Sequence, residues 1–135
     1  MTTFYCPNCW AEVPESATIC PYCHAEISER ISQADYVEKL ISALRHKEPT
    51  TPVRAAWILG ERREEKAVPA LAKIVKKAKD AFLVESAVEA LGKIGGDTAS
   101  DVVRAAAHHS SLRVRVKARG VLRDFASKGQ LRADE

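Results

Sequence analysis

The sequence predicts an all-α fold, a short right-handed α-solenoid of helical hairpins that follows a small cysteine-bearing N-terminal module. Three observations lead to this prediction. After residue 34, apolar residues recur at the i, i+3 and i+4 spacing of an α-helix. The segment Ala55–Gly60 recurs 32 residues later at Ala87–Gly92, and a fixed period near 30 is typical of stacked helical hairpins. All four cysteines fall in two Cys-Pro-x-Cys pairs near the N-terminus.

The two cysteine pairs predict a metal site. Cys6 and Cys9 form the first pair, and Cys20 and Cys23 form the second, with ten residues between the pairs. Each pair offers two sulfurs from one tight turn, and the proline in each pair presets the backbone angle of such a turn. Four thiolates fill the tetrahedral shell of zinc, so no position remains for a catalytic water. The prediction is therefore one structural Zn²⁺.

Three other uses of these cysteines compete with zinc. Disulfides need an oxidising compartment, and no apolar signal segment stands at the N-terminus. A redox dithiol needs a strand–helix unit around one Cys-x-x-Cys, which the sequence lacks. Cys20–His24 also matches the Cys-x-x-Cys-His haem attachment pattern, but haem would leave the first cysteine pair without a role.

The stretch from Phe4 to Ala25 resembles the short zinc ribbons found at the front of many prokaryotic proteins. The two knuckles and Glu12-Val13-Pro14 between them carry this resemblance. That family usually has glycine directly after each knuckle, where a positive φ is often needed. This chain has Trp10 and His24 there, and His24 is a conceivable replacement ligand.

The predicted ribbon domain covers residues 1–27. A module of this size cannot bury enough surface to fold alone, so metal binding supplies its folding free energy. Its small apolar packing layer is expected to hold four side chains: Tyr5, Trp10, Ile19 and Tyr22.

The repeat array is expected at residues 34–128, after a linker at 28–33 and before a flexible tail at 129–135. Gly60 and the Gly95–Gly96 pair are read as helix ends. Tyr36 and Trp57 sit at periodic positions and are expected in the core. Six helices are predicted, at about 34–46, 52–62, 66–79, 82–94, 98–109 and 112–127.

The array resembles HEAT repeats of the short type found in phycobilisome bilin lyases. The phrases at residues 53–60 and 67–71 carry this resemblance, with Val84–Gly92 and Leu112–Leu122. The resemblance concerns the scaffold and implies no lyase activity. The turn that usually reads Ile-Gly-Asp is replaced by the charged residues 62–64 in the first repeat.

The HEAT resemblance implies a protein-binding surface on the second helix of each unit. The exposed candidates there are Lys39, His46, Lys73, Lys77, Arg104 and His108. A solvated basic face is the alternative reading. On the last helix, Arg115, Arg119 and Arg123 follow one another at i, i+4 spacing. This row could bind an acidic protein surface or phosphates, or it could be the polar end of the array.

Composition and charge limit the function. No run of about 18 apolar residues occurs, so no membrane span is expected, and we expect the protein in the cytoplasm. The repeats contain no constellation of cysteine, histidine or carboxylate residues that indicates catalysis, so we expect neither an enzyme nor a small-molecule substrate.

Two functions then remain. The first is a non-enzymatic adaptor that binds protein partners through the ribbon and the array. The alternative is a nucleic-acid binder that uses a basic solenoid face. The net charge of only +3, and a ribbon region 1–29 with four glutamates and no lysine or arginine, favour the adaptor.

Overall fold

A computed structural model of the chain describes residues 4–27 and 33–127. The chain forms two compact units, Met1–Ala55 and Ala56–Glu135. The predicted tail at 129–135 lies outside the described residues, and so does the predicted linker except for Gln33, where the first helix begins. None of the helices within the described ranges combines the length and apolarity that crossing a membrane requires.

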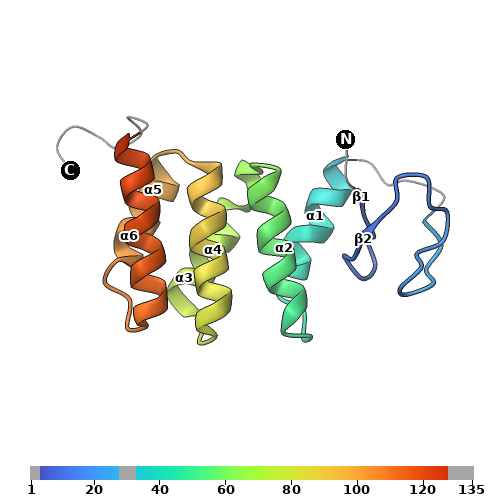
Figure 1. The fold of residues 1–135 in the computed structure, drawn as a ribbon, viewed down its shortest axis with the longest axis horizontal. Helices are drawn as coiled ribbons and strands as arrows, with labels where there is room; N and C mark the ends of the chain where they lie inside the picture. The colour runs from blue at the N-terminus through green and yellow to red at the C-terminus, as the bar shows by residue number, and fades with distance from the viewer. Residues whose placement is uncertain (1–3, 28–32, 128–135) are drawn as a thin grey trace. The chain divides into compact units, whose positions relative to one another are not determined.

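The first unit begins with two small hairpins. Strands β1 (Phe4–Tyr5) and β2 (Glu12–Val13) pair antiparallel, with Tyr5 opposite Glu12. A single antiparallel bridge between Ile19 and Glu26 closes the second hairpin. The first helix of this unit, α1 (Gln33–Ala43), follows (Figure 1). Along α1 the buried positions follow the helical period: Tyr36, Val37, Leu40 and Ala43, with Leu44 beyond its end.

Tyr36 joins α1 to the ribbon. Its hydroxyl donates a hydrogen bond to the carbonyl oxygen of Tyr5 at 3.0 Å and accepts one from the Tyr5 N–H at 3.2 Å. Its ring meets Trp10 edge-to-face at 5.2 Å between centroids and Phe4 at 5.7 Å. Tyr36 is 4% exposed and Trp10 is 3% exposed. The expected core position of Tyr36 is confirmed, and the ribbon and α1 share one apolar contact surface.

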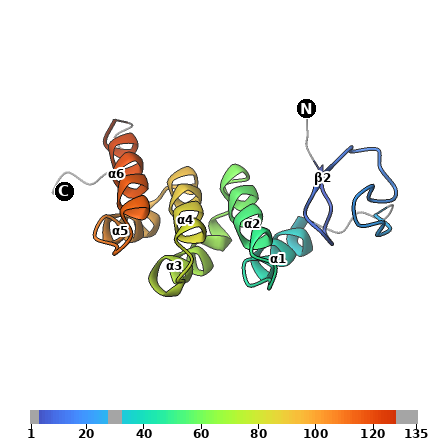
Figure 2. The same cartoon turned by 60° about the horizontal axis from the view of Figure 1, so that its bottom comes forward.

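The second unit is a stack of helices. Helix α2 (Thr50–Glu61) contains the boundary between the two units, and a short 3₁₀ turn, η1 (Glu65–Ala67), follows it. The remaining helices are α3 (Val68–Lys77), α4 (Ala81–Ile94), α5 (Asp97–Ala106) and α6 (Leu112–Ser127). In Figures 1 and 2, α4 and α6 lie side by side in one layer, and α3 and α5 lie in a second layer. The predicted all-α repeat fold is confirmed.

Two glycines let the first helices of successive repeats, which are α2, α4 and α6 and form the first-helix layer, approach each other closely. A Cβ on Gly60 of α2 would lie 2.8 Å from the Cα of Ala90 in α4. A Cβ on Gly92, one repeat later, would lie 2.7 Å from the Cγ1 of Val121 in α6. The interpretation of Gly60 as a helix end was therefore wrong. It lies inside α2, where the absence of a side chain permits packing against α4.

The turn after α2 is closed by a non-glycine residue in the left-handed conformation. Arg63 has φ 54°. Its N–H donates to the carbonyl of Gly60 at 3.0 Å, and the N–H of Glu64 donates to the carbonyl of Leu59 at 3.1 Å. These are the two hydrogen bonds of a Schellman motif. Gly95, 32 residues later, has φ 76° after α4, so a residue with a left-handed φ follows the helix in both repeats.

Candidate metal centre

The two cysteine pairs sit in the turns of the two hairpins, and their backbones repeat each other. The N–H of Cys6 donates to the Ala11 carbonyl at 3.0 Å, and the N–H of Cys20 donates to the Ala25 carbonyl at 2.9 Å. In each turn, the residue after the second cysteine donates back to the carbonyl of the first. The two turns therefore present two pairs of sulfurs in the same local geometry.

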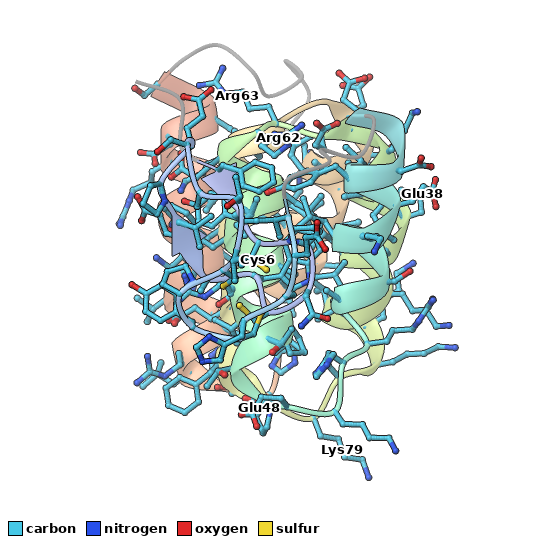
Figure 3. The ribbon with its side chains drawn as sticks, turned by 90° about the vertical axis from the view of Figure 1, so that its right-hand side faces the viewer. Cys6, Glu38, Glu48, Arg62, Arg63 and Lys79 are labelled. Atoms are coloured by element: carbon cyan, nitrogen blue, oxygen red, sulfur yellow. The ribbon has the colours of Figure 1, made fainter. Side chains whose placement is uncertain are left out.

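The four sulfurs converge on one point. The Sγ atoms of Cys6 and Cys23 are 3.7 Å apart, and those of Cys9 and Cys20 are 3.6 Å apart. All four Sγ atoms lie within 4.8 Å of one another, and Figure 3 shows the sulfur atoms gathered beside Cys6. A tetrahedron of sulfurs at 2.3 Å from zinc has edges of about 3.8 Å. The donor set and its spacing therefore fit a tetrahedral zinc ion.

Backbone and side-chain N–H groups point at the sulfurs. The N–H of Asn8 lies 3.4 Å from the Sγ of Cys6, and the N–H of Tyr22 lies 3.4 Å from the Sγ of Cys20. The side-chain amide of Asn8 also donates to the Sγ of Cys23 at 3.4 Å. Such donors stabilise thiolates, which are the form that binds a metal.

The thiol pKa values reflect burial and these donors. For the thiols without a bound cation, burial raises the pKa of Cys9 to about 12 and raises the pKa of Cys6 as well. The Asn8 amide lowers the pKa of the half-buried Cys23 thiol to about 6. A metal cation must therefore displace protons from the buried thiols on binding, and its affinity rises with pH.

The residues after the knuckles adopt the conformation that glycine usually provides. Trp10 has φ 62° and His24 has φ 64°. The departure from the usual ribbon pattern thus leaves both turns intact. His24 is exposed and is not among the clustered ligand atoms, which are the four cysteine sulfurs alone in the described residues.

The predicted apolar layer of the ribbon was half wrong. Trp10 is buried, but Ile19 is 58% exposed and Tyr22 is 68% exposed. Side chains alternate along an extended strand, and Cys20 faces the sulfur cluster, so its neighbour Ile19 faces outward. The observed ribbon core consists of Cys6, Val13, Cys20 and Ile27, with Phe4, Cys9, Ala17 and Cys23 packed against it.

Fold and site together define a zinc-binding helical-repeat protein. A family model described as a zinc-ribbon domain matches residues 5–27. A model described as HEAT repeats matches residues 37–123, which is well over half of the chain. The chain therefore belongs to the HEAT-repeat family and carries an N-terminal zinc ribbon. None of the curated proteins compared with the chain matches it.

The predicted partner-binding residues of the second helices have varied surroundings. Lys39 on α1 is exposed, and the exposed His46 accepts the N–H of Glu48 at its Nδ1. Lys73 and Lys77 lie exposed on α3, and His108 lies exposed just after α5. Arg104 on α5 is half-buried and pairs with Asp101 at 2.9 Å. Because α3 and α5 are neighbours, the structure brings the cations of these two helices onto adjacent elements.

The three arginines of α6 do not form one uniform surface. The Nη1 of Arg115 donates to the carbonyl oxygens of His109 and Ser110 at 2.8 and 3.0 Å, which ties α6 to the end of α5. Arg119 is exposed. Arg123 lines a groove of about 840 Å³ between α4 and α6. At least one member of the row therefore has a structural partner inside the chain.

Sequence reasoning missed the ion pairs that cross from one first helix to the next. Lys93 lies 2.7 Å from Glu61, Arg113 lies 3.4 Å from Glu85, and Lys117 lies 3.9 Å from Glu89. The two residues of each pair are 28 or 32 positions apart in the sequence. Opposite charges about one repeat apart could therefore have predicted these ion pairs. These pairs are partly exposed, so each contributes at most about 1 kcal/mol.

Trp57 belongs to the same layer and was wrongly placed in the core. It is 43% exposed, and the Nζ of Lys93 lies 5.7 Å from its ring centroid. Arg113 lies over the exposed ring of Phe82 in a similar way, at 4.5 Å. Lys93, Arg113 and Lys117 of the first-helix layer are thus engaged by carboxylates or rings of the chain itself.

Proposed function

We propose that this protein is a non-enzymatic adaptor in which one structural zinc ion folds the ribbon, and the ribbon and the helical array each bind a protein partner. The closed sulfur cluster carries the proposal. Four thiols within 4.8 Å of one another satisfy a tetrahedral zinc completely. Such a site has no open position for a substrate or an activated water. The role left to it is to hold the ribbon in its folded form.

The proposed location is the cytoplasm. All four cysteines are free thiols in the structure, and zinc–thiolate sites persist where thiols are kept reduced. A location that oxidised these thiols would remove the ligands and the folded ribbon with them.

The distribution of charge over the array supports partner binding at the second helices. In the first-helix layer, Lys93, Arg113 and Lys117 each pair with a carboxylate of the preceding helix in that layer. On α3, Lys73 and Lys77 are exposed and have no ion-pair partner within the described ranges. Exposed cations with no internal partner attract an acidic protein surface and set the orientation in which it docks.

The test is an affinity capture from lysate of the native organism, with and without nuclease, read by mass spectrometry. Lys77→Glu is compared with Arg54→Glu, which makes the same change of charge at an exposed position of α2. We expect a discrete protein partner that survives nuclease, is weakened by Lys77→Glu and is retained by Arg54→Glu.

Two results would contradict the adaptor. Partners that disappear with nuclease, together with duplex binding that weakens steeply as salt rises, would establish the nucleic-acid alternative. The absence of any reproducible protein partner would remove the proposal altogether.

A further inference from the structure

The two hairpins of the ribbon are copies of each other at a shift of 14 residues. This shift places Cys20 on Cys6, Ile19 on Tyr5 and His24 on Trp10. The hydrogen bonds of the two turns match at this shift, and both residues after the knuckles have φ near 60°. Each hairpin therefore presents an equivalent backbone edge.

The edge of the first hairpin is occupied by a tyrosine. The N–H and the carbonyl of Tyr5 both point away from β2, and both hydrogen-bond the hydroxyl of Tyr36. Ile19 occupies the equivalent place opposite Glu26. Its N–H and carbonyl make no hydrogen bond to any residue that the structure describes. The second hairpin thus has the same outward-facing backbone edge as the first, but no tyrosine among the described residues binds it.

This second edge is flanked by exposed apolar side chains, and the ribbon that carries it is acidic. Ile19 and Tyr22 are both well exposed, and three residues of chain keep their Cα atoms within about 11 Å. The described ribbon carries three exposed glutamates (Glu12, Glu15 and Glu26) and no lysine or arginine. Zinc with four thiolates would add two negative charges. This surface repels phosphate polymers and attracts basic protein segments.

We infer that the second hairpin, residues 18–27, is a docking site for a partner helix that carries a tyrosine among lysine or arginine residues. The tyrosine hydroxyl bridges the N–H and carbonyl of Ile19, as Tyr36 does at Tyr5. Its ring lies beside His24, in the place that Trp10 has in the first hairpin. The inference rests on the proposed function, because it names the partner class of the adaptor's ribbon.

The first experiment titrates the ¹⁵N-labelled, zinc-loaded full chain with a lysine- and alanine-rich helical peptide of about 15 residues that carries one tyrosine. The control peptide has phenylalanine in place of the tyrosine. We expect the amide signals of Ile19, Tyr22 and His24 to move and that of Tyr5 to stay. Binding of the phenylalanine peptide should be roughly fivefold weaker, since it lacks the hydroxyl.

Ile19→Lys and Ser16→Lys provide the matched variants, because both positions are exposed on the ribbon and the charge change is the same. Zinc content is measured for both, so that loss of the fold is not mistaken for loss of binding. We expect Ile19→Lys to weaken the tyrosine peptide by more than about tenfold, and Ser16→Lys by no more than about threefold.

Four results would overturn the inference: no binding at millimolar peptide, equal binding of the two peptides, shifts that spare Ile19, or shifts at Ile19 caused by a single-stranded DNA oligonucleotide. Capture of native partners separates this failure from that of the adaptor. Nuclease-resistant partners that the Ile19→Lys chain retains in full would overturn this docking site and leave the adaptor standing. If the wild-type chain captures none, the adaptor fails, whatever the peptide does.

Discussion

Replacing Gly60 with alanine is expected to destabilise the helical array, although the same change stabilises most helical positions. A new Cβ would lie 2.8 Å from the Cα and 3.0 Å from the Cβ of Ala90. Carbon atoms pack at about 3.5 Å or more, so α2 and α4 would have to move apart by roughly 0.7 Å. The obstacle is backbone, which cannot rotate away as a long side chain can.

The magnitude follows from two opposing effects. Overpacking of this kind costs about 1–3 kcal/mol, and alanine recovers about 1 kcal/mol of helix propensity over glycine. The obstructing atom is backbone, so we expect a net loss of about 1–2 kcal/mol, which lowers the melting temperature by roughly 3–8 °C. Thermal unfolding followed by far-UV circular dichroism, with zinc in excess, measures this shift.

Gly120→Ala is the matched control within the same array. A Cβ there would meet only the Nη2 of Arg123, at 3.9 Å. Helix propensity alone then acts, and we expect stabilisation by up to about 1 kcal/mol. Stabilisation by Gly60→Ala as large as that by Gly120→Ala would show that α2 and α4 are not closely packed at Gly60.

Three further predictions concern the ribbon and the turn after α2. Asn8→Ala removes the donor that keeps the pKa of Cys23 near 6, so the Cys23 thiol becomes protonated at higher pH. Zinc release on acidification, measured with a chromogenic chelator, should therefore move to higher pH, and an unchanged midpoint would contradict this. Tyr36→Phe keeps the ring but removes the hydroxyl partner of Tyr5, so hydrogen exchange of the Tyr5 amide should accelerate by at least about fivefold, whereas unaltered exchange would count against the contact. Arg63→Gly removes the steric strain of a non-glycine residue in the left-handed conformation and should raise the free energy of unfolding in urea by roughly 1 kcal/mol. A loss of stability would show that contacts of the Arg63 side chain outweigh this strain.

The helices and the cysteine cluster could be predicted from sequence because local spacing determines both. The i, i+3, i+4 pattern located the helices to within a few residues of their observed bounds. Two Cys-Pro-x-Cys turns brought four thiols together because each turn fixes two sulfurs locally. Periodicity does not reveal what a buried residue touches. Tyr36 was expected in the core, but its attachment to the backbone of Tyr5, 31 residues away, depends on how the ribbon docks on α1.

Each residue whose location was predicted wrongly differs from the prediction for a physical reason. Ile19 was placed in the ribbon core by its hydrophobicity, but strand alternation beside the metal-facing Cys20 turns it outward. Gly60 was interpreted as a helix end, because glycine at a close helix–helix contact looks the same in sequence as glycine at a C-terminus. Trp10, His24 and Arg63 show the complementary case, since non-glycine residues hold left-handed positions that glycine fills in related sequences.

The most direct test of the central claim is amide hydrogen exchange of the full chain before and after zinc is removed with a chelator. If zinc folds the ribbon and the ribbon supports α1 through Tyr36, residues 4–27 lose their protection, the amides of α1 near Tyr36 exchange faster, and α3 to α6 keep theirs. Protection that persists across residues 4–27 without zinc, or that is lost along the whole chain, would contradict the account.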